Sequence, residues 1–222
     1  MKRLGVSLVI VVALVSAAAA PAADPRAEKE RLTAADNARA KRGVVVRAWL
    51  PPGWTRTAPT PDGDEDYDCP GYDPDFSAFT ITGKAKSAFK HPSGSELESE
   101  VAVFKSRAQA SADFRLTMKP GLVSCMRTVM LDEIRKSDQA GQLDVSISAR
   151  MTSPPRIGER SSGFRVVVRM RPANGAAAPV TLTVDGLAVQ KGRSIGFVMF
   201  TAFAKPFAGQ VAVARAMAAR MS

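Results

Sequence analysis

The strongest constraint on the fold of this chain comes from its only two cysteines, Cys69 and Cys125. A disulfide between them would hold together two segments that lie far apart in the sequence. Closing so long a loop stabilises the folded state by on the order of 4 kcal/mol in the chain-entropy treatment. The alternative is two unpaired thiols, which are a reactive liability in an exported protein. The compartment in which the protein folds therefore decides between the two.

The N-terminus has the layout of a secretory signal peptide over residues 1–22. Lys2 and Arg3 make its start basic, its core over 4–15 is apolar, and the residues after that are mostly alanine. Cleavage is expected after Ala22. An uncleaved anchor is the alternative, although a spanning helix needs roughly 20 apolar residues. We therefore expect a mature protein without a spanning helix, secreted or held in the cell envelope, where oxidising conditions favour the disulfide.

The chain is basic, with a formal net charge of +10. Such a charge suits an anionic envelope component or a small anionic ligand as the partner, and it speeds association without specifying it. Nucleic acid is a poor fit, because the basic residues are scattered and aromatic residues make up only 6% of the chain. The partner itself stays unknown from the sequence.

Beyond the signal peptide we expect a helical spacer over 23–42 and a single α+β domain over 43–222. The spacer is rich in alanine and charge, with Asp24 as a helix cap, Pro25 in the first turn and Gly43 as the stop. Its apolar face is thin, which predicts a loosely held segment.

Apolar periodicity predicts the elements of the domain. Strands are expected over 43–50, 76–82, 84–91, 98–105, 143–151, 164–170, 180–190 and 194–203. Helices are expected over 107–118, after an S-x-x-Q capping box at Ser106, and from Pro120 and Pro206 onward. The strand over 180–190 is expected to contain a bulge at Asp185-Gly186. The strand over 194–203 is apolar on both parities and should lie centrally in the sheet.

The segment 62–75 concentrates seven acidic residues around Cys69. Four of them, Asp64, Asp66, Asp68 and Asp75, stand at the first, third, fifth and twelfth positions of an EF-hand-like loop. The pattern fails where the loop needs glycine, because Cys69 stands there, and Asp75 is shorter than the usual glutamate. Two interpretations stay open, a calcium site or a solvated acidic loop that faces a basic body.

Two further groups of residues invite a chemical interpretation. His91, the only histidine, and Ser194, within a G-x-S-x-G match, are the candidates for a hydrolytic site, but that serine precedes a strand instead of a helix. A surface histidine and a hairpin turn are the simpler interpretations. Lys84, Lys86 and Lys90 share one strand parity and form either a solvated face or, if they face a cleft, a contact for an anionic ligand.

Seven short motifs carry a resemblance to a known group of proteins. They are LPPGW at 50–54, CPGYDPDFS at 69–77, ITG at 81–83, EVAVFKSRAQA at 100–110, SCM at 124–126, PPRIGERSSGFRV at 154–166 and KGRSIGFV at 191–198. With these motifs the chain resembles exported actinobacterial proteins of uncharacterised function and, more broadly, PknH-like extracellular sensor and PsbP-like secreted domains. PknH-like sensors carry two disulfides, whereas this chain has cysteines for one.

The resemblance implies a twisted antiparallel sheet with helices packed mainly on one face and a cleft between them. It supplies no catalytic residues. No cofactor is expected, apart from the calcium ion that the spacing of Asp64, Asp66, Asp68 and Asp75 suggests. We therefore expect a secreted, non-enzymatic domain that binds a ligand or partner in a sensor-like way. The alternatives are a metal-dependent or hydrolytic secreted enzyme, and a purely structural envelope protein.

Overall fold

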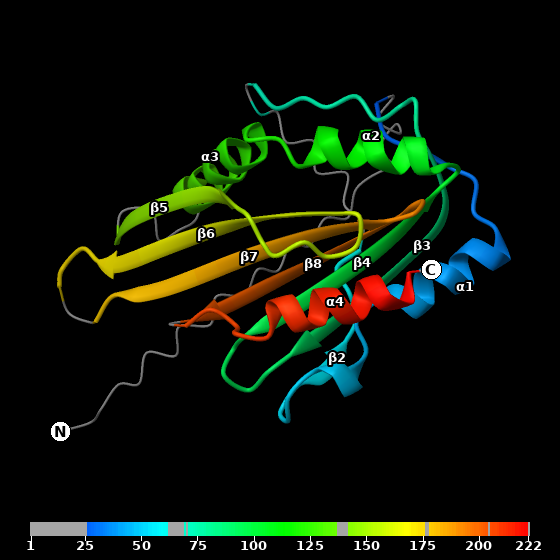
Figure 1. The fold of residues 1–222 in the computed structure, drawn as a ribbon. Helices are drawn as coiled ribbons and strands as arrows, with labels where there is room; N and C mark the ends of the chain where they lie inside the picture. The colour runs from blue at the N-terminus through cyan, green and yellow to red at the C-terminus, as the bar shows by residue number, and fades with distance from the viewer. Residues whose placement is uncertain are drawn as a thin grey trace.

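The computed structural model describes residues 26–61, 69, 71–136, 142–175, 178–203 and 205–221, and within them one sheet of eight strands organises the chain (Figure 1). The strands are β1 (Lys29–Glu30), β2 (Thr55–Thr57), β3 (Thr80–Lys90), β4 (Glu96–Phe104), β5 (Leu143–Thr152), β6 (Arg160–Pro172), β7 (Val180–Lys191) and β8 (Ser194–Phe203). The helices are α1 (Ala34–Gly43), α2 (Arg107–Thr117), α3 (Gly121–Lys136) and α4 (Gln210–Arg220), with a 3-10 turn η1 (Arg47–Trp49).

The strand order is β1-β3-β4-β8-β7-β6-β5, and β2 pairs with β3 beside β1. All of these pairs are antiparallel except that between β1 and β3. The central place predicted for the strand over 194–203 is confirmed, because β8 lies between β4 and β7. The expected bulge at Asp185-Gly186 is absent, since β7 keeps one register with both of its neighbours.

Helices cover both faces of the sheet (Figure 1). Val101 of β4 packs in a cluster with Val213 and Met217 of α4, whereas the adjacent Ala102 packs with Ala110 of α2 on the opposite face. α1 joins α4 on the first face, and α3 joins α2 on the second. The α+β class and the mostly antiparallel sheet are confirmed, but the helices do not lie mainly on one face. In the central strands both odd and even positions are apolar, so both faces of the sheet must be shielded from water by helices.

The strand predicted over 43–50 does not form. Val44 and Val45 belong to the core, and residues 47–49 form η1. The backbone of Val45 bonds to two serines, since its N–H donates to Ser99 Oγ at 3.0 Å and its carbonyl accepts from Ser87 Oγ at 2.8 Å. An apolar run indicates burial, and here buried hydroxyls take the place of a neighbouring strand.

The helix predicted over 24–42 is shorter and more firmly packed than expected. It begins at Ala34, where the side chain of the N-cap Thr33 accepts from the Asp36 N–H at 3.2 Å. Residues 29–30 instead form β1, and the side chains of Asp36 and Ala40 are buried. The part of the predicted spacer that the structure describes therefore packs against the domain and is not loosely held. The domain boundaries themselves stay a prediction.

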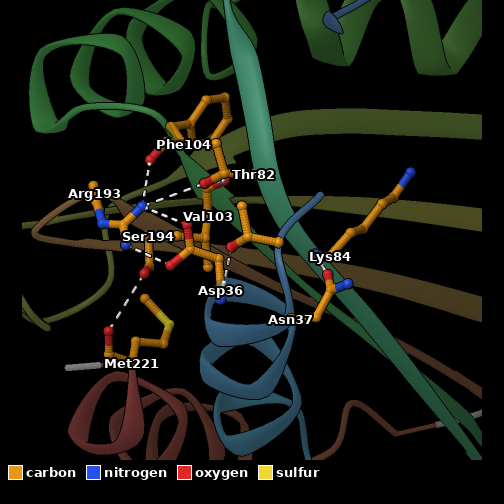
Figure 2. A network of polar contacts seen from close by, with 10 residues as sticks. Asp36, Asn37, Thr82, Lys84, Val103, Phe104, Arg193, Ser194 and Met221 are labelled. Carbon is orange, nitrogen blue, oxygen red and sulfur yellow. Dashed lines mark hydrogen bonds and ion pairs between the residues drawn. The ribbon is translucent and has the colours of Figure 1, made fainter. Parts of the chain in front are cut away.

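The ion pair between Asp36 and Arg193 joins α1 to the turn between β7 and β8 (Figure 2). Nη1 and Nη2 of Arg193 both donate to the Asp36 carboxylate, and Nη1 also donates to the Phe104 carbonyl at 3.1 Å and to Thr82 Oγ1 at 3.3 Å. Gly83 makes this approach possible, because a Cβ there would overlap the backbone of Asp36. The hydrogen bond from Arg193 holds the pKa of the Asp36 carboxyl below its usual range.

We expect Asp36→Asn to lower the free energy of unfolding by about 2–4 kcal/mol, because it leaves a half-buried guanidinium without its charge partner. Since the pKa of Asp36 is depressed in the folded state, its contribution is present above about pH 4 and is lost as the pH falls through the folded-state pKa. Urea denaturation at neutral and acid pH measures both effects. The matched control is Asp132→Asn, which removes an exposed ion pair with Arg135. Equal losses in the two variants would contradict the prediction.

Candidate functional site

A groove of about 410 Å³ lies along the edge of β3, beside the stretch between its pairings with β1 and β2. This volume falls within the range of small-molecule sites. Its lining comes from α1, from the segment that follows α1, from β2 and from β3. The lining residues are Lys41, Val44, Val45, Val46, Arg47, Arg56, Lys84, Ala85, Lys86 and Phe89.

Two buried serines hold the segment that lines one side of the groove. Ser87 of β3 and Ser99 of β4 are Cα partners across the sheet, and their hydroxyls lie 2.8 Å apart. Together they take both backbone hydrogen bonds of Val45. The segment 44–46 is therefore held against β3, and its half-buried Val46 and the half-buried Ala85 of β3 supply apolar walls.

Three exposed basic residues surround the groove from three different segments. Lys41 lies in the last turn of α1, Arg47 begins η1, and Arg56 lies in β2. Arg47 Nη1 donates to the Leu50 carbonyl at 2.7 Å, which fixes its side chain near the groove. Across the described ranges none of the three has an ion-pair partner within 4.0 Å. Uncompensated like charges around one concavity attract an anion.

The lysine strip predicted from the sequence lies partly at this groove. Lys84 and Lys86 line it, whereas Lys90 lies outside it and pairs with Glu96 at 2.9 Å. The ammonium groups of Lys84 and Lys86 each lie 3.7 Å from a carboxylate oxygen of Glu100. Lys84 also lies 3.6 Å from Glu30, so a carboxylate compensates each ammonium of the strip. A role for the three lysines in binding an anion stays a prediction.

Sequence reasoning missed Lys41, Arg47 and Arg56. The one available signal was that all three fall within residues 41–56, around the apolar run 44–46. From the sequence that run predicts a strand, in which neighbouring side chains point to opposite faces of the sheet. In the structure the run is pinned by serines at the sheet edge, and the basic residues on either side of it meet there.

The predicted disulfide is present. Cys69 is joined to Cys125, with Cα atoms 5.1 Å apart. Cys125 is buried in α3, and the nearby Tyr72 hydroxyl donates to the Thr117 carbonyl at the end of α2 at 2.9 Å. The disulfide therefore ties Cys69 of the acidic segment to α3, and the Tyr72 hydrogen bond ties the same segment to the end of α2. A disulfide fits an extracellular location.

The calcium prediction falls largely outside the described residues, where Asp64, Asp66 and Asp68 lie. Asp75 is exposed, and its Oδ1 accepts from the Ser77 N–H at 2.9 Å. The hydrogen bonds from Ser77 lower the pKa of the Asp75 carboxyl. In the described ranges no three histidine, cysteine, aspartate or glutamate residues converge as metal ligands would. The calcium site stays a prediction.

His91 and Ser194 do not form a catalytic pair. His91 follows the end of β3, and its Nδ1 lies 2.8 Å from the Ser93 hydroxyl in the turn that leads to β4. Ser194 pairs with Val103 at the opposite end of β4. Its side chain is fully buried, and its hydroxyl donates to the Met221 carbonyl at 3.3 Å (Figure 2). The G-x-S-x-G match is a hairpin turn, in which Gly192 adopts a positive φ of 59°.

A buried carboxyl lies on the other face of the sheet. Asp113 of α2 is 7% exposed and is hydrogen-bonded to the side chain of Glu28, just before β1. Burial raises the pKa of Asp113 to about 7, and the charge of Glu28 acts in the same direction. Burial, together with the charge of Asp113, also raises the pKa of Tyr72 to about 12. Asp113 therefore takes up a proton on folding in mildly acidic solution.

Comparisons with known proteins give a structural likeness without a sequence family. No protein-family model matches the sequence, and no curated protein matches it either. Among solved structures the chain is similar to the extracellular domain of PknH from Mycobacterium tuberculosis, with a TM-score of 0.34 and 12% identity. The match covers 64% of each chain, so it spans less than two thirds of that domain. No helix in the described ranges is both long and apolar enough to cross a membrane.

We expect the protein to lose roughly 2–3 kcal/mol of unfolding free energy between pH 5 and pH 8 through Asp113. Its folded-state pKa is raised, so its contribution is complete below about pH 4 and disappears as the pH rises through about 7. Asp113→Asn mimics the protonated acid and should flatten this slope in urea denaturation. Asp132→Asn on the surface of α3 should keep the slope of the natural protein. A parallel pH dependence in all three proteins would overturn the assignment.

Proposed function

We propose that this protein is a non-enzymatic domain, outside the cell or in its envelope, that binds a ligand bearing a carboxylate or phosphate group in the groove beside β3. One observation carries the proposal. Lys41, Arg47 and Arg56 all line one concavity of about 410 Å³, and in the described part of the chain none of them forms an ion pair with a carboxylate. Charge and concavity together favour a bound anion over a merely solvated surface.

The side chains also define the shape of the ligand. Arg47 and Arg56 each present a planar fork that bonds two oxygens of one carboxylate or phosphate, whereas Lys41 acts as a point charge. The half-buried Val46 and Ala85 offer apolar contact to the part of the ligand that carries no charge. We therefore infer an anionic headgroup joined to a less polar body, as in a lipid headgroup or an acidic envelope glycan.

The position of the groove suggests how ligand binding would change the structure next to it, as a sensor-like role requires. Residues 44–47 connect α1 to η1 and touch both the groove and the core. Trp49 of η1 packs near the guanidinium of Arg220 in α4, 5.5 Å from its ring centre. A ligand bound to Arg47 would shift residues 44–47 and η1. The fluorescence of Trp49, which lies in η1, would report that shift.

The test is titration of the purified protein with glycerol phosphate, with galacturonate and with vesicles containing phosphatidylglycerol, followed by calorimetry and tryptophan fluorescence. We expect Arg47→Gln and Arg56→Gln each to weaken binding of the preferred anion about tenfold, because each removes a charge-assisted bidentate contact. Arg135→Gln, which removes an equal charge from the surface of α3, should leave the affinity unchanged.

The three titrations separate the sources of the anion. Binding of free glycerol phosphate indicates that the headgroup suffices, whereas binding of galacturonate alone indicates an acidic glycan. Absence of binding to all three probes would refute the proposal. Equal weakening by Arg135→Gln would also refute it, because it would show attraction by net charge alone.

A further inference from the structure

The strand β5 forms an open end of the sheet. Among the strands that the structure describes it pairs with β6 alone, and it runs for ten residues in one unbroken register without a proline. None of its residues is buried, and exposed positions alternate with half-buried ones along its length. Proteins normally protect such an edge with bulges, prolines or very short strands. Because β5 has none of these, it offers a ready template for another strand.

The direction of the backbone hydrogen bonds shows which groups lie on this edge. The Ala173 N–H donates to the Gln142 carbonyl at 2.9 Å, so this pair is hydrogen-bonded in the ladder between β5 and β6. Bonded and non-bonded pairs alternate along an antiparallel ladder. The even-numbered residues of β5 therefore bond to β6. The N–H and carbonyl groups of Leu143, Val145, Ile147, Ala149 and Met151 point away from the sheet.

The sequence of this strand is self-complementary about Ile147. A second copy running antiparallel with Ile147 opposite Ile147 satisfies the outward-pointing groups of both strands. The same register pairs Asp144 with Arg150 twice, once on each side of the two-fold axis. It also places Leu143 opposite Met151, Val145 opposite Ala149 and Ser146 opposite Ser148.

The two charged residues are available for ion pairs across this edge. Asp144 and Arg150 are exposed, and neither has an ion-pair partner within 4.0 Å among the residues that the structure describes. The Cα partner of Arg150 on β6 is another arginine, Arg165, whose guanidinium is bonded to Asp185. A carboxylate from a second copy would therefore meet an uncompensated cation.

Other registers lose this match. A shift by two residues in either direction places Asp144 opposite Ser148 or Thr152, and a shift by six places like charges opposite each other. Opposite charges across a strand pair stabilise it, and like charges destabilise it. The charge pattern therefore selects one register.

The apolar side of the strand agrees with the same arrangement. Val145, Ile147 and Ala149, like Met126 and Met130 of α3, pack against the buried cluster of β6 and β7, but they remain half-buried. A two-fold axis perpendicular to the sheet places both α3 helices on the same side. The two Ile147 side chains then lie next to each other beneath them, and apolar surface on both copies is covered.

We propose that two copies of this protein pair through β5, antiparallel and centred on Ile147, to form one continuous sheet. The contact uses the same patch on both copies and closes as a dimer. It does not extend into a filament, because the two-fold contact uses the β5 edge of both copies.

The first test is sedimentation of the purified protein, under non-reducing conditions, between about 1 µM and about 1 mM. The mass should rise from monomer to dimer. Asp144→Arg and Arg150→Asp should each raise the dissociation constant at least about tenfold, because each replaces two attractive pairs with two repulsive ones. An equimolar mixture of these two variants restores both attractive pairs and should form a heterodimer.

The matched control is Lys205→Asp, a charge reversal at an exposed loop position that should leave the dimer intact. A monomer at every concentration, or a dimer that is insensitive to the two reversals, overturns the proposal. The natural protein gives a second measurement that does not depend on any variant. Exchange of the Val145, Ile147 and Ala149 amide hydrogens should slow as the protein concentration rises. Exchange that is independent of concentration also overturns the proposal.

Discussion

The ion pair between Asp36 and Arg193 fixes the part of the molecule on which the groove depends. α1 buries few of its side chains, and Asp36 and Ala40 are the two that reach inward. Arg193 binds Asp36 and the Phe104 carbonyl at once, so it joins α1, the end of β4 and the turn between β7 and β8. Because the segment 44–47 follows directly from α1, its place beside β3 depends on this contact and on Ser87 and Ser99.

The elements with the strongest periodicity were predictable, and the elements at the sheet edge were not. The alternation of Val145, Ile147 and Ala149 and the two-sided apolar pattern of β8 gave the correct strands, and Ser106 caps α2 as expected. These signals are local. The failures at 43–50 and at the start of α1 share one cause, because partners distant in the sequence decided the structure there. Buried serines replaced a strand, and Arg193 turned a weakly apolar helix into a packed one.

The charged residues of the candidate site show the same limit of prediction from the sequence. A basic strip on β3 was visible in the sequence, yet β4 places a glutamate directly opposite Lys86 and another opposite Lys90. Lys41, Arg47 and Arg56 looked like scattered surface charge, and the fold brings them around one concavity without such opposites. A residue's charge can be counted from the sequence. Whether an opposite charge lies near enough to pair with it depends on strand register and on the paths of loops, which only the folded chain reveals.

The two ends of the sheet solve the problem of an open edge in different ways. At β3 the edge is covered in pieces, since β1 and β2 pair with its ends and the Asn37 side chain accepts from the Lys84 N–H between them at 3.1 Å. A concavity remains where this cover is incomplete, and the basic residues surround it. At β5 the edge is long and regular, and it carries two opposite charges at equal distances from Ile147. An edge that is interrupted and basic suits a small anion, whereas an edge that is continuous and self-complementary suits a second copy of itself. Ligand binding and self-association therefore belong to opposite ends of one sheet, and β4, β8, β7 and β6 lie between them.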